Sequence, residues 1–158
     1  MSENYKNKIH DIAVNTFEVT CYMFPLEEWE MEDDPITEVP KDGIQSVVGF
    51  NGAAEGEMVI TPTQELLTAI AANMLGEDSP SDEQKSGALG EIANIICGNL
   101  VPIFASNDKI CYLDPPKIIE GGFDDAGSPK LHEETVLVYL DEGTAEITVH
   151  YSKEGEDD

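Results

Sequence analysis

The sequence predicts an α+β fold: a single domain in which two long helices and a shorter one pack on one face of a five- to six-stranded, largely antiparallel sheet. Apolar residues recur at helical spacing over residues 5–24 and 81–106, which indicates the two long helices. Two pairs of apolar or alternating runs joined by short turns indicate β-hairpins. A chain of 158 residues is long enough for one domain with a substantial core. We expect the domain to span residues 1–151, followed by an acidic tail over 152–158.

The first helix is expected over Tyr5–Phe24, before a stretch, 25–42, that is rich in proline and acidic residues. Such a composition predicts an irregular connection, here with an extended piece at 36–39. Helix positions spaced by about three, four and seven residues form the expected buried stripe: Ile9, Ile12, Ala13, Phe17, Thr20, Cys21 and Phe24.

Two hairpins are expected, one from strands at 44–51 and 55–61, the other from strands at 135–140 and 144–151. The last of these strands alternates apolar and polar residues, which is typical of a sheet with one wet face. Short strand pieces are also expected on either side of Pro115-Pro116. Because proline cannot donate to a central ladder, these pieces are predicted to lie at a bulge or a sheet edge.

Helix boundaries can be predicted from capping residues. Thr61 is expected to cap the helix that follows the first hairpin, and Gly76 to end it. Ser81 is expected to cap the longest helix, 81–106, with Gln84 as its capping-box partner. The apolar face of this long helix is expected to be core, and it consists of Leu89, Ile92, Ile96, Leu100 and Ile103.

The opposite face of the long helix carries an unusual row of small residues. Gly87, Glu91, Asn94 and Gly98 follow one another at spacings of four, three and four, and Gly90 flanks the row. Each glycine inside a helix costs about 0.5–1 kcal/mol relative to alanine, so the glycines need a reason. Either they let another helix of the same protein pack closely, or they give a partner access to one carboxylate and one amide.

Charge excludes several classes of partner. The chain has 33 acidic and 8 basic residues, a net charge of −25, which argues against nucleic acid and against anionic membrane surfaces. The acidic runs at 27–34, 120–125 and 154–158 either serve solubility, as in a high-salt habitat, or steer a basic rim of a partner. With no signal peptide and no apolar run of about 18 residues, we expect a cytoplasmic protein without a membrane span.

Other familiar chemistry is not indicated. His10, His132 and His150 do not have the spacing of zinc ligands, and the pairs Asp124-Asp125 and Glu133-Glu134 lack an EF-hand pattern around them. Phosphate-binding and serine-hydrolase motifs are missing as well. The three cysteines are expected to be buried thiols in a reducing cytosol. We therefore expect no metal site or cofactor of the protein's own.

The run Glu91-Ile92-Ala93-Asn94, followed by Ile95-Ile96-Cys97-Gly98-Asn99, resembles the E-x-x-N helix of the chemotaxis phosphatases CheC, CheX and FliY. Pro116 lies 22 residues after Asn94, close to the proline spacing of that family. The preceding hairpin and helix fit the same family, so the resemblance covers nearly the whole chain.

Two features refine the resemblance. Gly87 stands where the family has Ser or Asp, and Ser86 is a poor substitute because it lies about 100° round the helix. In two-site members the first helix carries a second motif, whereas Asp11 and Asn15 have the wrong spacing for one. The chain thus resembles the single-motif CheX proteins, which implies a CheC/CheX-like fold and a homodimer.

The resemblance also implies a reaction. Members of this family hydrolyse the aspartyl phosphate of the response regulator CheY, which supplies the acyl phosphate, a divalent metal such as Mg²⁺ and a lysine. By resemblance, Glu91 pairs with that lysine and Asn94 orients the attacking water, while Gly87, Gly90 and Gly98 let the regulator approach. Two alternatives stay open: a non-catalytic module that binds a receiver domain or a flagellar or chemoreceptor component, and an acidic structural dimer.

Overall fold

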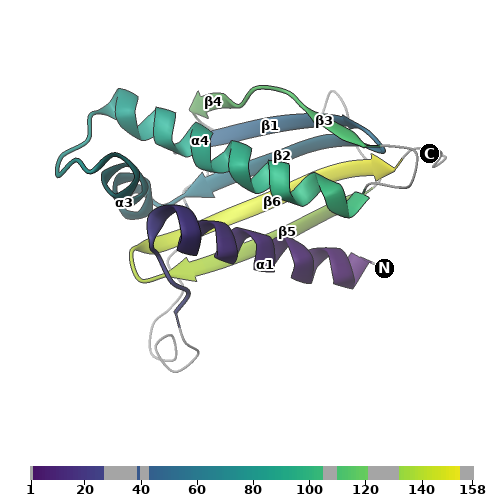
Figure 1. Ribbon diagram of the computed structural model, residues 1–158, viewed down its shortest axis with the longest axis horizontal. Coiled ribbons are helices and arrows are strands. Elements are labelled where there is room, and N and C mark those ends of the chain that lie inside the picture. Colours follow the sequence, from purple (N-terminus) through teal and green to yellow (C-terminus); the bar gives the residue numbers. More distant parts are fainter. Residues whose placement is uncertain (1, 27–38, 40–42, 105–109, 121–131, 154–158) are drawn as a thin grey trace.

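The structure is a computed structural model in which residues 2–26, 39, 43–104, 110–120 and 132–153 are described. Within them, three α-helices lie on one face of a six-stranded sheet (Figure 1). This arrangement confirms the predicted α+β fold. The expected extended piece at 36–39, the loop after residue 120 and the end of the acidic tail fall mostly or wholly outside the described residues.

All strand pairs in the sheet are antiparallel, and the strand order is β3-β1-β2-β6-β5, with β4 also paired to β1. The strands are β1 (Ile44–Gly52), β2 (Ala54–Pro62), β3 (Cys111–Leu113), β4 (Lys117–Glu120), β5 (His132–Leu140) and β6 (Gly143–Lys153). The hairpins β1–β2 and β5–β6 are the two that the sequence predicts. Both pieces around Pro115-Pro116 pair with β1 at the edge of the sheet, as expected for a proline pair.

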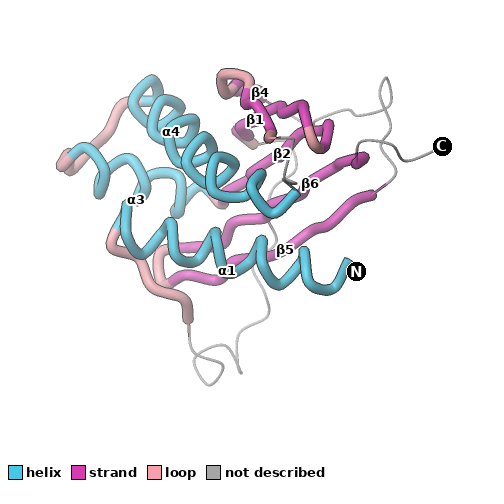
Figure 2. The backbone as a smooth tube through the Cα atoms, turned by 45° about the vertical axis from the view of Figure 1, so that its right-hand side comes forward, coloured by secondary structure: helices cyan, strands magenta, loops and turns pink. Residues whose placement is uncertain are grey.

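The helices are α1 (Ser2–Cys21), α3 (Gln64–Leu75) and α4 (Asp82–Leu100), and α4 continues into the short 3₁₀ helix η1 (Val101–Phe104). α1 and α4 run in opposite directions across the sheet, and α3 lies at the end where α4 begins (Figures 1 and 2). α1 packs mainly over β5 and α4 over β1. The apolar helix faces and the inner face of the sheet together form the core.

α1 ends three residues earlier than expected. Tyr22 has a left-handed backbone (φ 58°), which ends the helix, and the Met23 N–H donates to the Phe17 carbonyl at 3.1 Å. Met23 is therefore fully buried, whereas Phe24 is 62% exposed. The prediction that Phe24 continues the buried stripe is wrong, because the helix ends at Cys21 and Phe24 lies beyond it.

The start of α3 also differs from the prediction. Pro62 is the last residue of β2 and pairs with Ala145 of β6, so the helix cannot begin there. Thr63, not Thr61, is the N-cap, and its hydroxyl accepts a hydrogen bond from the Leu66 N–H at 3.4 Å. The end of α3 is as predicted, since Gly76 is the left-handed C-cap.

The predicted capping box of α4 is confirmed. The Ser81 hydroxyl accepts from the Gln84 N–H at 3.1 Å, and the Gln84 side chain accepts from the Ser81 N–H at 2.8 Å. The helix is shorter than the expected 81–106: it gives way to η1 at Val101, next to Pro102, which lacks the N–H that a further α-helical turn needs.

By length and composition, residues 82–104 are apolar enough to cross a membrane, which corrects the statement that the sequence holds no such run. Within this range, 56% of an apolar stretch of 18 residues is buried inside the fold. Its buried side chains face the sheet and the other helices, so α4 is the central core helix of the domain.

Gly56 permits close strand packing beneath an aromatic cluster. It pairs with Phe50 of β1 on one side and with Tyr151 of β6 on the other. The centroid of the Phe104 ring lies 5.9 Å from that of Phe50 and 4.7 Å from that of Tyr151. A Cβ atom on Gly56 would overlap the His150 carbonyl oxygen, so strands β2 and β6 would have to move apart.

We expect Gly56→Ala to lower the free energy of unfolding by about 1–3 kcal/mol, because the overlap involves backbone that cannot turn aside. Urea denaturation measures the effect. Gly87→Ala is the matched control: a Cβ there meets no atom within 4 Å, and alanine should stabilise the helix by about 0.5–1 kcal/mol. Equal stability changes in the two variants would contradict this account of Gly56.

Candidate functional site

The middle of α4 presents the predicted row to the surface. Gly87, Glu91 and Asn94 are exposed and Gly98 is half-buried. The opposite face is locked in place by side chains that are 0% exposed, namely Leu89, Ile92, Ile96 and Leu100. A helix fixed along one side in this way holds the carboxylate of Glu91 and the amide of Asn94 at the surface on a rigid element.

Glu91 and Asn94 are available to a partner. Neither side chain forms a hydrogen bond or an ion pair with another described residue. They are separated by three positions, so they stand on neighbouring turns of the same face. The arrangement can offer a partner one negative charge and, beside it, one neutral group that both donates and accepts hydrogen bonds.

Two shallow hollows flank this part of α4. The first, on the α3 side, has a volume of about 490 Å³ and is lined by Met74, Leu75, Glu83, Gln84, Gly87, Ala88 and Glu91. The second, on the β4 side, has a volume of about 540 Å³ and is lined by Glu83, Ser86, Gly87, Gly90, Glu91, Asn94, Pro116 and Ile118. Since Glu83, Gly87 and Glu91 belong to both, the exposed face of α4 is a ridge between two hollows.

The glycines have different surroundings. A Cβ on Gly90 would lie 3.7 Å from the Pro116 side chain, and one on Gly98 would lie 3.6 Å from Leu113, both ordinary contacts. Gly90 is buried, whereas the space over Gly87 is open. No described helix packs on this row, so close packing against the described helices does not explain it. The glycines keep the surface low around Glu91 and Asn94, and their contact with a partner stays a prediction.

Pro116 has a clear structural position. It is the proline that the sequence analysis related to the family pattern, and it lies against Gly90 with Ile118 beside it. The segment between β3 and β4 therefore forms one wall of the hollow that contains Asn94.

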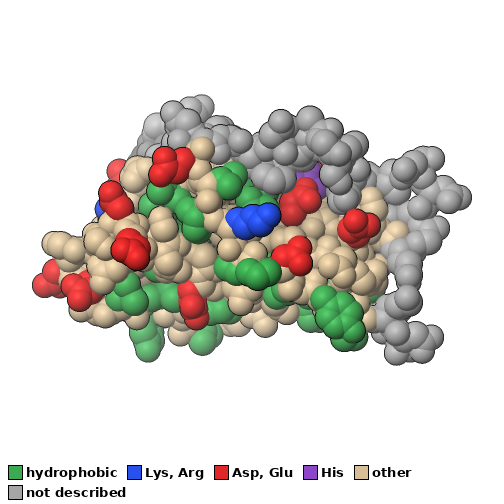
Figure 3. Space-filling view, turned by 90° about the horizontal axis from the view of Figure 1, so that it is seen from above, with side chains coloured by type: hydrophobic (Ala, Val, Ile, Leu, Met, Phe, Trp, Pro, Cys, Tyr) green, Lys and Arg blue, Asp and Glu red, His purple; other side chains and the backbone are tan. Residues whose placement is uncertain are grey.

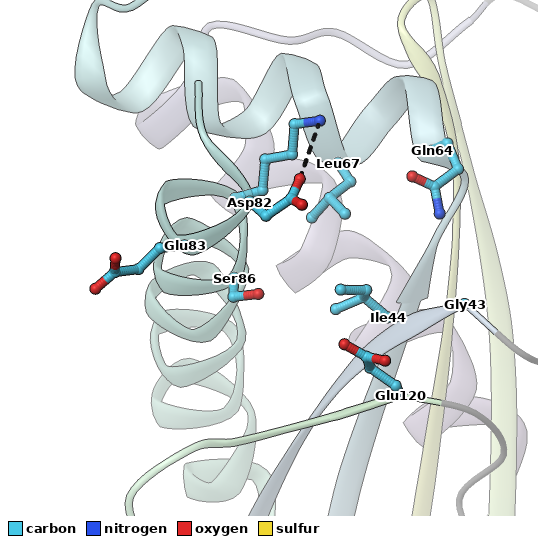
Figure 4. Close-up of a pocket in the computed structure, with 9 residues that line it drawn as sticks. Gly43, Ile44, Gln64, Leu67, Asp82, Glu83, Ser86 and Glu120 are labelled. Atoms are coloured by element: carbon cyan, nitrogen blue, oxygen red, sulfur yellow. Dashed lines mark ion pairs between the residues drawn. The ribbon is translucent and has the colours of Figure 1, made fainter. Parts of the chain in front are cut away.

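A third hollow lies at the start of α4, between that helix, α3 and β1 (Figure 4). The Lys85 ammonium is 4.0 Å from the Asp82 carboxylate, an i, i+3 contact on the first turn. The Lys85 side chain therefore contacts a residue of its own helix.

The described surface seen from above carries many acidic side chains and few basic ones (Figure 3).

The two buried cysteines, Cys21 and Cys97, are weak nucleophiles. Burial, and then the nearby Cys111, raise the pKa of the Cys97 thiol to about 12. Burial, and then Glu142, raise the pKa of Cys21 to about 11. Both thiols are protonated at neutral pH, and a thiol is a poor nucleophile. Cys111 is half-buried rather than fully buried as expected.

The tertiary structure brings together groups that the sequence left apart. His150 of β6 lies 3.2 Å from the Glu57 carboxylate of β2 and 3.7 Å from Glu133 of β5. Strand alternation places this cluster on the sheet face away from the helices. Across the described part of the chain, no three His, Cys, Asp or Glu side chains are grouped to hold a metal ion.

Comparison with known proteins connects this geometry to a family. A family model described as chemotaxis phosphatase CheX matches residues 44–140. No curated protein sequence matches the chain.

Solved structures share the fold at low identity. The crystal structure of the CheX–CheY–BeF₃–Mg²⁺ complex from Borrelia burgdorferi matches with a TM-score of 0.67 and 20% identity, over 94% of this chain and 98% of that chain. The chemotaxis protein CheX from Desulfovibrio desulfuricans matches with a TM-score of 0.71 and 16% identity, over 94% and 99%. A CheC-like protein from Shewanella oneidensis matches with a TM-score of 0.68 and 21% identity, over 96% and 100%.

Proposed function

This chain belongs to the CheX chemotaxis phosphatase family, and we propose that it hydrolyses the aspartyl phosphate of a CheY-type response regulator. The observation that carries the proposal is the pair Glu91 and Asn94, exposed and without a partner among the described residues, on a helix fixed by its buried face. The complex of CheX with CheY from Borrelia burgdorferi supports the choice of partner. We also propose that the protein is cytoplasmic and that it acts on the regulator as a homodimer.

The chemistry needs little from the phosphatase itself. The receiver domain supplies the acyl phosphate, its bound Mg²⁺ and a lysine, so the metal neutralises charge on the partner's side. Water attacks phosphorus, the bond from phosphorus to the aspartyl oxygen breaks, and the aspartate carboxylate and inorganic phosphate are released. Because the transition state is loose, positioning and charge stabilisation account for most of the catalysis.

Glu91 and Asn94 divide this work. Glu91 pairs with the lysine of the receiver and docks α4 at the phosphorylated aspartate. Asn94 enters the site and holds the attacking water in line with the phosphorus. An amide suits this role better than a carboxylate, because it orients water without adding negative charge beside a phosphoryl group.

The alternative is a module that binds a receiver domain without hydrolysing its phosphate. Gly87 favours this alternative, because it provides no side chain where the family has Ser or Asp, and the space above it is open. In the proposed function Glu91 and Asn94 carry the reaction without a third group.

Release of inorganic phosphate from a phosphorylated CheY-type receiver domain tests the proposal. With catalytic amounts of the protein and Mg²⁺ present, we expect faster release that saturates with receiver concentration. The receiver alone gives the baseline for its own hydrolysis. Binding without acceleration, across a panel of CheY-type receivers, would select the module instead.

A further inference from the structure

Leu75 is an exposed apolar side chain beside the candidate site. It is the last residue of α3 and is 49% exposed, and the left-handed Gly76 that follows ends the helix there. A single exposed leucine is ordinary on a protein surface. Leu75 differs because it lines the same hollow as Glu91, together with Met74 and Ala88.

A receiver domain docked on Glu91 would extend over this hollow. A specific interface covers about 800 Å² on each partner, far more than the side chains of Glu91 and Asn94 offer. The ridge between the hollows is one helix wide, so an interface centred on Glu91 must spread to both sides of α4. On the α3 side it meets Leu75, and on the β4 side it meets Ile118, which is 36% exposed.

Charge and apolar contact have separate roles in such an interface. Glu83, an exposed acidic group on the ridge, attracts basic groups of a partner and speeds its arrival more than it holds the partner in place. Apolar side chains that become desolvated near the centre of an interface supply much of the affinity.

Resting on the proposed function, we propose that Leu75, with Met74 and Ala88, forms an apolar seat for a non-polar side chain of the CheY-type receiver domain. The seat sets the affinity for the receiver and takes no part in the hydrolysis step. Its occupant is the receiver, because the hollow is continuous with the residues that face the phosphorylated aspartate.

Leu75→Ser tests the seat, with Leu75→Met as the conservative variant. We expect the serine variant to raise KM for the phosphorylated receiver about tenfold with kcat unchanged, and the methionine variant to keep the wild-type KM. Ile110→Ser is the matched control, because Ile110 is 58% exposed and lies beyond the other end of α4. It should change neither constant. Melting temperatures of all three variants report on the fold.

Direct binding separates this inference from the proposed function. Titration with a beryllofluoride-activated receiver measures affinity without turnover, so Leu75→Ser should weaken binding even if the protein proves not to be a phosphatase. Wild-type affinity in Leu75→Ser would overturn the seat, and so would a loss confined to kcat. Sedimentation of the free protein tests the other possible occupant, a second copy of the chain. If the wild type is a dimer and Leu75→Ser is a monomer, the hollow belongs to the dimer interface.

Discussion

Asn94→Ala is expected to lower kcat for hydrolysis of the phosphorylated receiver by about 100-fold or more, with little change in KM. The variant loses the group that holds the attacking water, and misplacement of a reacting group by about 1 Å is enough for an effect of this size. Asn94 is exposed and makes no hydrogen bond with another described residue, so its removal should leave stability within about 0.5 kcal/mol of the wild type. Single-turnover phosphate release gives the rate.

Asn99→Ala is the matched control for this experiment. Asn99 is exposed and lies five residues later on the same helix, outside the residues that line the two hollows. Its alanine variant should keep the wild-type kcat. Wild-type turnover in Asn94→Ala would end the assignment of the site. A large fall in its melting temperature would show instead that the Asn94 side chain packs within the fold.

Glu91→Gln is expected to act on affinity. Gln has nearly the shape of Glu but no charge, so the variant removes the ion pair with the receiver's lysine and leaves a neutral hydrogen-bonding group. If the pair is desolvated in the complex, KM should rise about 30-fold or more. The dependence of KM on salt should weaken in the variant, because one charge pair fewer is screened.

Glu83→Gln distinguishes a specific ion pair from the general acidity of the surface. Glu83 lines the same two hollows as Glu91 and is also exposed, but it lies two helical turns earlier. Its loss should raise KM about fivefold or less, as for an exposed rim charge. Equal effects in Glu83→Gln and Glu91→Gln would show that Glu91 adds only to the overall charge.

The sequence alone determined the features that depend on neighbours along the chain. The capping box of Ser81 and Gln84 formed as predicted because both partners lie within one helical turn. The exposed positions of Glu91 and Asn94 followed from helical spacing, since an apolar stripe on one face leaves the other face to solvent. The hairpins were likewise recognisable from alternation and short turns.

Tertiary structure decided what depends on residues far apart in the chain. α3 begins at Gln64 rather than near Pro62 because β2 continues to pair with β6, and Ala145 lies more than eighty residues beyond Pro62. The hollow beside Glu91 exists because α3 ends against α4, which places Leu75 next to that helix. The pattern of residues within α4 does not indicate that Leu75 is its neighbour. Local rules fix hydrogen bonds within a turn or a hairpin, whereas strand pairing and helix packing depend on which distant surfaces bury each other, and a single sequence does not show which surfaces those are.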